Sequence, residues 1–180
     1  HTAIADFPSR QFYEGKLQIV PLAHQQLQPQ PCASANGITR ILSLRNVAFV
    51  DAPAPESSVN DKTNQVEAEM IAATIHQIYL LTRSTEKGFS TDHTVGVIVP
   101  YRNQIATIRS AIDAAYRTMY GDADSKQAEA QRNKLHNITI DTVERYQGSQ
   151  RDYCPLYTTD AADELPRVKH GGRRNTKKKK

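Results

Sequence analysis

The chain has 180 residues, enough for one domain with a hydrophobic core. It contains no long apolar run and opens without a signal-peptide pattern, so the sequence predicts no membrane span and no membrane partner. Its formal net charge is +4, but eight basic residues and no acidic ones lie in 167–180. Without that segment 15 basic residues stand against 19 acidic ones, so the charge of the whole chain gives no support for a nucleic-acid surface on the folded part.

The N-terminal part predicts short helical pieces, a loop and one strand. Residues 2–15 have helical spacing, with Pro8 placed to restart a helix. Three side chains of this stretch are expected to pack the first helix against a sheet: Arg10, Phe12 and Tyr13. The Gln- and Pro-rich stretch 25–31 predicts a surface loop, and the apolar run 46–50 predicts a short strand.

The remainder alternates helices and strands. Apolar residues at three- and four-residue spacing predict a helix over about 62–83. The β-branched run Thr94–Val99 predicts a strand buried on both faces, and an amphipathic helix follows it. After a polar helix near 127–134, Ile138–Thr142 predicts a further strand and Asp152–Thr158 another.

This order of elements predicts an α/β fold in which helices flank a parallel sheet. In such sheets ligands bind beyond the carboxyl ends of the strands. The predicted ends are all rich in polar groups: Asp51–Ala52, Pro100–Arg102 and Thr142–Gln147. We therefore expect the binding groups of this protein to lie in these three segments.

Three longer segments show a family resemblance. They read HTAIADFPSRQFYEGKL over residues 1–17, VGVIVPYRNQI over 95–105 and ITIDTVERYQGSQRD over 138–152. In this order they resemble the second RecA-like domain of superfamily 1B DNA/RNA helicases, of the RNA-surveillance helicase or replication helicase–nuclease type. The resemblance covers residues 1–153 and implies a RecA-like parallel sheet that is incomplete at its C-terminal end. Residues 154–180 do not match this family and predict a disordered basic tail, either natural or produced by a frameshift.

The resemblance assigns four residues to nucleotide binding. Gln147 and Gly148 match an element that faces the cleft between two motor domains, and a glycine suits a backbone that bends tightly or approaches a ligand. Gln150 stands where the family has an acidic residue, so it keeps the hydrogen bonding without the charge. Arg102 follows a strand end, where its guanidinium suits bidentate phosphate binding; a salt bridge to a neighbouring carboxylate is the alternative.

Three further residues are implied to bind nucleic acid. Thr142 closes its strand and matches a threonine that holds a phosphate of the bound strand, although strand propensity alone also favours threonine there. Tyr101 is placed either to stack on a base or sugar or to join the core. Gln104 lies one helical turn farther along, in the family's P-Y-R-x-Q element.

The motifs that cradle and hydrolyse ATP do not occur in this sequence. It contains no G-x-x-x-x-G-K-[ST] and no D-E-x-x-Q, so we predict no catalytic or metal-binding residue in this chain alone. The resemblance implies a fragment of an ATP-dependent helicase. Its complete parent would bind ATP and Mg²⁺ together with the first RecA-like domain, and its partner would be single-stranded DNA or RNA.

Two other interpretations of function stay open. A non-catalytic nucleic-acid-binding or adaptor module with a RecA-like fold would bind strands without turnover. A small-molecule enzyme on a doubly wound sheet has little support, because no G-x-G-x-x-G and no nucleophile elbow occur. Since Cys32 and Cys154 show no C-x-x-C spacing, we expect no disulfide scaffold and a cytoplasmic location.

Overall fold

The centre of the fold is a small parallel sheet. A computed structural model describes residues 2–20, 37–44, 46–51, 63–121 and 126–156. Within these residues β1 (Gly96–Val99) pairs in parallel with β2 (Thr139–Thr142), and the two strands end level because Val99 lies opposite Thr142. The predicted strands at 94–99 and 138–142 are therefore confirmed, as is the parallel α/β class.

A third segment runs along the other edge of β1. The backbone N–H of Gly96 donates to the carbonyl of Tyr153 at 3.1 Å, and a parallel bridge joins Ile98 to Leu156. Because these N–H groups point away from β2, β1 occupies the middle of the sheet. The strand predicted over 152–158 is present in the described residues as isolated bridges, and its last two residues lie outside them.

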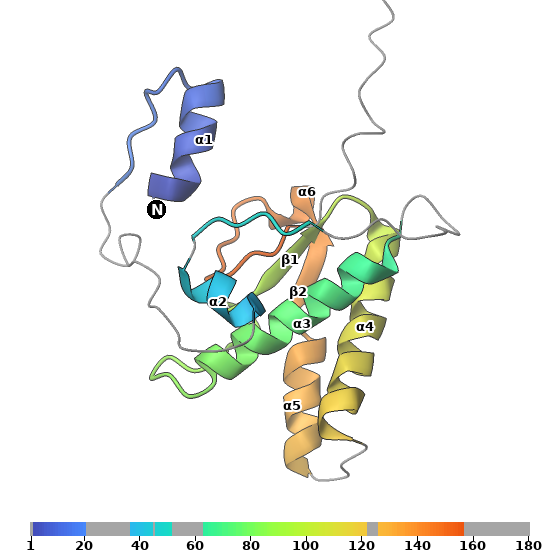
Figure 1. The fold of residues 1–180 in the computed structure, drawn as a ribbon. Helices are drawn as coiled ribbons and strands as arrows, with labels where there is room; N and C mark the ends of the chain where they lie inside the picture. Colours follow the sequence, from blue (N-terminus) through green and yellow to red (C-terminus); the bar gives the residue numbers. More distant parts are fainter. Residues whose placement is uncertain (1, 21–36, 45, 52–62, 122–125, 157–180) are drawn as a thin grey trace, which may run out of the picture.

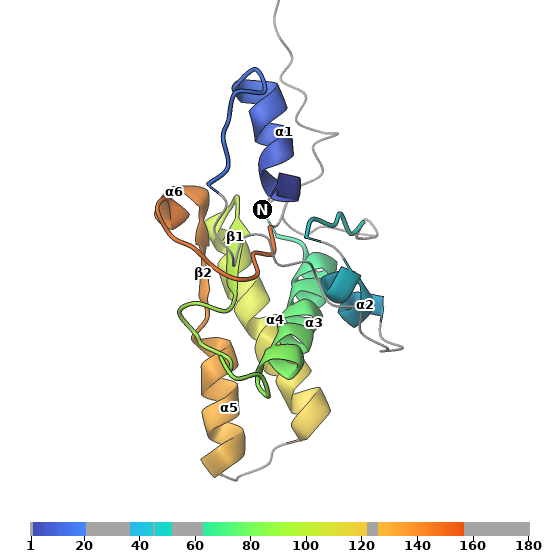
Figure 2. The ribbon, with the colours of Figure 1, turned by 90° about the vertical axis from the view of Figure 1, so that its left-hand side faces the viewer.

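Helices pack over the sheet, as Figures 1 and 2 show from two directions. The two long helices, α3 (Gln65–Thr82) and α4 (Arg102–Tyr120), pack on each other, and α5 (Lys126–His136) packs beside α4. The short helix α2 (Gly37–Leu44) lies against α3, and the single turn α6 (Val143–Tyr146) follows β2 directly. The predicted helices near 62–83, after the first buried strand and near 127–134 are confirmed.

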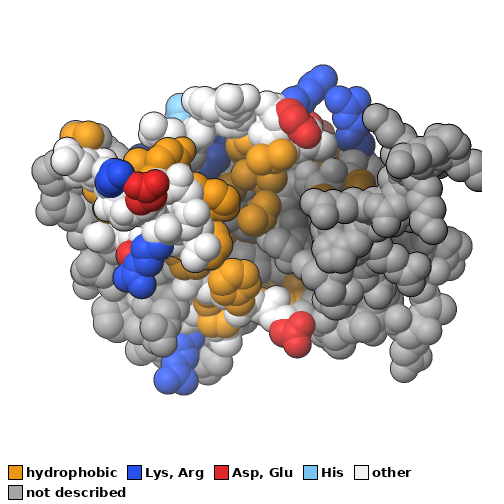
Figure 3. Space-filling model, turned by 90° about the horizontal axis from the view of Figure 1, so that it is seen from above, with side chains coloured by type: hydrophobic (Ala, Val, Ile, Leu, Met, Phe, Trp, Pro, Cys, Tyr) orange, Lys and Arg blue, Asp and Glu red, His pale blue; other side chains and the backbone are white. Residues whose placement is uncertain are grey.

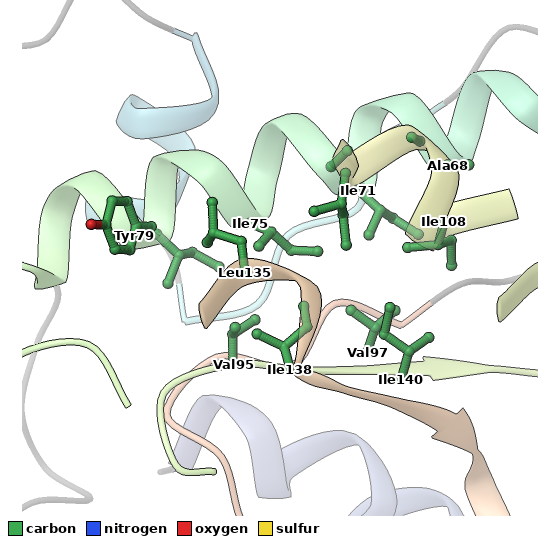
Figure 4. Close-up of a cluster of buried hydrophobic side chains, with 14 of the residues drawn as sticks. Ala68, Ile71, Ile75, Tyr79, Val95, Val97, Ile108, Leu135, Ile138 and Ile140 are labelled. Carbon is green, nitrogen blue, oxygen red and sulfur yellow. The ribbon is translucent and has the colours of Figure 1, made fainter. Parts of the chain in front are cut away.

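Branched apolar side chains from the sheet and the helices form one core (Figure 4). Its largest fully buried members come from α3, α4, β1 and the residues just before each strand: Ile75, Ile78, Val95, Val97, Val99, Ile108 and Ile138. Burying one such side chain stabilises the fold by roughly 1.5 to 3 kcal/mol relative to its exposed state. This core fixes the two strands against α3 and α4 and so sets the position of their carboxyl ends.

The first helix differs from the prediction in two ways. α1 (Thr2–Phe12) continues through Pro8 instead of restarting after it, because a proline in an exposed helix removes one backbone hydrogen bond without excluding the helix. None of its residues is buried, and Phe12 is 74% exposed. The prediction that this segment packs against the sheet is therefore wrong for its three named residues: Arg10, Phe12 and Tyr13. Its apolar stripe instead brings the rings of Phe7 and Phe12 edge to face, with centroids 6.4 Å apart.

The predicted strand at 46–50 is not formed. This segment is irregular, and Phe49 is 95% exposed. A β-branched and aromatic run becomes a strand only when a neighbouring strand completes its hydrogen bonds, and this segment has no such neighbour in the described residues. Asp51 is consequently not a strand end, and one of the three predicted binding segments is lost.

Candidate nucleotide and nucleic-acid interface at the strand ends

The residues that follow β1 and β2 meet at one edge of the sheet. Because Val99 and Thr142 are register partners, the chain leaves both strands at the same level. Tyr101 is the N-cap residue of α4, and Thr142 is the N-cap residue of α6. Of the three predicted binding segments, the structure therefore brings two together, and we call their meeting place the strand-end edge.

A shallow hollow of about 400 Å³ opens at the strand-end edge. It is lined by residues of β1, of α6 and of the turn that follows: Ile98, Val143, Glu144, Tyr146 and Gln147. Val143 exposes 60% of its surface there. Seen from above, hydrophobic side chains gather on this face with charged side chains around them (Figure 3). The hollow therefore combines an apolar floor with a polar rim.

Thr142 is buried and its backbone N–H is used inside the loop. This N–H donates to Asp141 Oδ1 at 2.8 Å. Hydrogen bonding by the backbone of Glu144 and by the side chain of Thr142, with the charge of Arg102, lowers the pKa of the exposed Glu144 carboxyl. At neutral pH this rim therefore carries a negative charge, which opposes a phosphate beside Thr142.

Arg102 opens α4 on the other side of the strand-end edge. Its side chain is exposed, and it affects Glu144 through charge. Glu144 is thus the candidate partner for the alternative role of Arg102, a salt bridge. Because the guanidinium is exposed, it can still donate hydrogen bonds to a ligand from solvent. An exposed guanidinium at the first turn of a helix is suited to phosphate.

The turn after α6 has the backbone that its glycine predicts. Gly148 has a φ of +81°, and the N–H of Ser149 closes the turn on the carbonyl of Tyr146 at 2.9 Å. Within the described residues, no atom other than those of Gly148 and its two chain neighbours lies within 4 Å of the place where a Cβ would stand on Gly148. Glycine is therefore required by the left-handed backbone and leaves an open approach, flanked by the exposed side chains of Gln147 and Gln150.

This turn is supported by a cluster that the sequence analysis did not predict, formed by Gly96, Tyr146 and Arg151. Arg151 donates to the carbonyl of Gln150 at 2.7 Å and to Thr139 Oγ1 at 3.2 Å, while its guanidinium lies 5.7 Å from the ring centroid of Tyr146. The Tyr146 hydroxyl donates to the Thr139 carbonyl at 2.7 Å. Gly96 lets this ring approach β1, since a Cβ there would lie 2.2 Å from the Tyr146 hydroxyl. The sequence does contain one sign of this contact, because a glycine inside a buried strand often marks the close approach of another group.

Gln104 does not lie at the strand-end edge as a binding group. Its side chain is fully buried, accepts from the backbone N–H of Asn64 at 2.9 Å and donates to the Asn64 carbonyl at 2.8 Å. The predicted contact with nucleic acid does not fit this geometry, because the amide already joins the first turns of α3 and α4. Tyr101 is half-buried at the start of α4, between the two alternatives that its sequence position left open.

The hydrogen-bond donors at the strand-end edge suit a phosphate on only one part of that edge. Arg102, the two glutamine amides and the open backbone at Gly148 can all donate hydrogen bonds. Glu144 repels anions from the hollow itself. The geometry therefore fits a nucleotide phosphate beside Arg102 and the glycine turn, outside the hollow.

These features define an α/β domain of incomplete RecA-like form, with polar loops at the carboxyl ends of parallel strands. Sequence comparison matches residues 1–161 to the family described as AAA domain. The chain belongs to this family, and it is a helicase-like, nucleotide-binding domain of AAA/RecA type with a function related to nucleic acid. No solved structure matches it. No helix in the described ranges is long and apolar enough to cross a membrane.

Proposed function

We propose that this chain is the second motor domain of an ATP-dependent superfamily 1B DNA/RNA helicase. The observation that supports it best is the meeting of Arg102, Thr142 and the Gln147–Gly148 turn at one edge of a parallel sheet. In the complete parent this edge would face the first RecA-like domain. Resemblance to the surveillance and replication helicases is consistent with work on single-stranded DNA or RNA in the cytoplasm.

On the nucleotide side, this chain would supply donors and no metal ligand. ATP with Mg²⁺, held mainly by the first motor domain, would supply the phosphoryl group whose transfer drives movement. In the complete parent Arg102 would bind phosphate oxygens of the nucleotide, and the amides of Gln147 and Gln150 would hydrogen-bond to it. In this chain alone, without a nucleotide, the same guanidinium would bind a phosphate of the strand. Gly148 would let the nucleotide approach the backbone, because no side chain blocks the turn.

On the strand side, Thr142 and Tyr101 would contact the nucleic acid. The Thr142 hydroxyl would donate to a phosphate oxygen of the strand. Tyr101 would offer a ring to a base or sugar beside it. Since Thr142 is buried and the Glu144 carboxylate lies two residues away, we expect strand binding by the isolated domain to be weak.

The test is salt-dependent binding of fluorescent single strands, measured by anisotropy on the whole chain and on a version ending at Pro166. The shorter version removes eight basic residues that would bind any polyanion. We expect binding to persist without the tail and to weaken by about tenfold in Arg102→Ala, the loss of one charge-assisted phosphate contact. Arg117→Ala, an exposed arginine in the last turn of the same helix, is the matched control and should leave it unchanged.

The proposal would be contradicted if the version ending at Pro166 bound no strand. It would also be contradicted if Arg102→Ala and Arg117→Ala changed the strand affinity equally. Tight strand binding that ATP analogues never alter, even after the first motor domain is supplied, would favour the adaptor interpretation. Turnover of ATP by this chain alone would also contradict it, because the phosphate cradle and the metal site are expected on the other domain.

A further inference from the structure

We propose that the hollow beside α6 is a platform for one base of the bound single strand and that it prefers bases carrying an amino group. This inference rests on the proposed function, because it needs a strand at the strand-end edge. It goes beyond that function by giving the domain a base contact and a source of sequence preference. The groups that carry it are Val143, Ile98, Glu144 and Gln147.

The floor of the hollow suits the flat face of a base. Val143 is 60% exposed and Ile98 is half-buried, and the ring of Tyr146 adds a third apolar wall. A volume of about 400 Å³ accommodates a planar ring together with its sugar edge. An open apolar surface of this kind takes a base by its face, which every base offers, so the floor gives affinity without preference.

The rim decides which part of a nucleotide enters. Glu144 is an exposed carboxylate, and it repels a phosphate while accepting hydrogen bonds from N–H groups. A carboxylate accepts up to about four hydrogen bonds and donates none, and Glu144 is exposed at the rim. Its oxygens can therefore accept from an amino group, as glutamate does from the N4 amino group of cytosine.

Arg102 and Glu144 would therefore contact different parts of one nucleotide, its phosphate and its base. Arg102 begins α4 just after β1, and Glu144 lies in α6 just after β2, so both residues border the strand-end edge where the two strands end level. A strand that places its phosphate beside Arg102 brings the attached base toward Val143 and Glu144. Opposite charges at the two positions fix the orientation of that nucleotide, because the reverse placement would set phosphate against carboxylate.

The first experiment compares a thymine strand with an abasic strand of the same length, in the presence of the whole chain. We expect the base-bearing strand to bind about three- to tenfold tighter. Val143→Ser should remove most of this difference. Met119→Ser, which changes another exposed apolar side chain at the far end of α4, should leave the difference as it is.

The second experiment compares cytosine strands with uracil strands, because uracil lacks the methyl group of thymine and has a carbonyl where cytosine has its amino group. We expect cytosine to bind about three- to tenfold tighter, the net worth of one ordinary hydrogen bond at an exposed acceptor. Glu144→Gln should bring this ratio close to one while raising the overall affinity, because a repulsive charge is lost. Glu129→Gln on α5 removes an exposed carboxylate elsewhere and should preserve the ratio.

The outcomes separate this inference from the proposed function. A chain that binds neither strand overturns both. A chain whose strand binding depends on Arg102, but which holds abasic and thymine strands equally or ignores the amino group, overturns the base platform alone. Differences that appear in the wild-type chain and vanish in the Val143 and Glu144 variants support it.

Discussion

The substitution Gly96→Ala tests whether close contact between β1 and the α6 turn holds the strand-end edge together. A Cβ on Gly96 would lie 2.2 Å from the Tyr146 hydroxyl and 2.9 Å from Arg151 Cγ. The arginine is flexible and can shift, but the tyrosine hydroxyl is fixed by its 2.7 Å hydrogen bond to the Thr139 carbonyl. The added methyl group must therefore push Tyr146 off this partner.

The expected cost follows from these two contacts. Losing the hydrogen bond costs about 1 kcal/mol, and forcing a methyl group into a filled space costs about 1 to 3 kcal/mol. We therefore expect Gly96→Ala to lower the free energy of unfolding by about 2 to 4 kcal/mol. The assay is urea unfolding followed by far-UV circular dichroism, since the chain contains no tryptophan, with the slope of the transition checked for constancy.

A double-mutant cycle tests the reason for the loss. Tyr146→Phe removes the atom that clashes most, so adding it to Gly96→Ala should cost about 1 kcal/mol less than the sum of the single changes. Gly37→Ala is the control, because nothing surrounds its Cβ position and it begins a helix; it should be neutral or slightly stabilising. A Gly96→Ala cost below about 0.5 kcal/mol, or strict additivity with Tyr146→Phe, would refute the reasoning.

Three further predictions concern stability. Burial, followed by the charge of Arg83, lowers the pKa of His76 from 6.5. The unfolded chain therefore binds more protons than the folded chain, and stability should fall as pH drops below about 6.5. In urea unfolding at several pH values, His76→Asn should remove this dependence, whereas the exposed His93→Gln should keep it. Burial raises the pKa of Tyr146 from 10.0 to about 12, so stability should decline as pH rises from 10 towards 12. Burial also raises the pKa of Tyr116, Tyr120 and Tyr153, so Tyr146→Phe should reduce the late tyrosinate absorbance by one tyrosine without abolishing it. Gln104→Ala should cost about 2 to 3 kcal/mol in urea unfolding, because it leaves the Asn64 N–H without its partner and empties a fully buried position, while the Asn64 carbonyl keeps its bond from the Ala68 N–H; an unchanged midpoint would contradict that role.

The parts of the fold that were predicted correctly are those where one strong local pattern coincides with burial. The run Thr94–Val99 is rich in β-branched residues, and all of it is buried except Ile98, which is half-buried, so composition alone indicates a central strand. The apolar spacing of α3 and α4 matches the face that each turns to the core. Such patterns depend on few neighbours, so they can be recognised without the structure.

The failures come from contacts that a local pattern does not contain. α2 was missed because its buried positions are the polar residues Thr39 and Ser43, and Thr39 donates to Gln77 of α3 at 2.7 Å. Phe49 and Phe12 looked like core residues by type, yet no element in the described structure covers them. Hydrophobic residues are often exposed, so residue type alone could not decide their burial.

The residues of the candidate site divide in the same way, into those predicted from a local pattern and those that depend on contacts distant in sequence. Gly148 was predicted as a tight turn from its residue type, and its positive φ confirms the turn. Arg102 and Thr142 were placed correctly at strand ends, while their binding roles stay predictions. The supporting cluster of Gly96, Tyr146 and Arg151 joins two segments about fifty residues apart, and pairing of that kind requires the register of the sheet.

The bond between Gln104 and Asn64 has an electrostatic consequence. It joins the first turns of two long helices, which diverge from a common corner towards the opposite side of the molecule (Figure 1). Each helix carries about half a positive charge at its start, so two such ends meet beside Tyr101 and Arg102, while the negative ends are kept apart. The backbone itself thus gives an otherwise acidic body a positive corner. In the version without residues 167–180, whose eight basic residues attract any polyanion, we expect a polyanion to be drawn to this corner, and its rate of association should fall as salt is added.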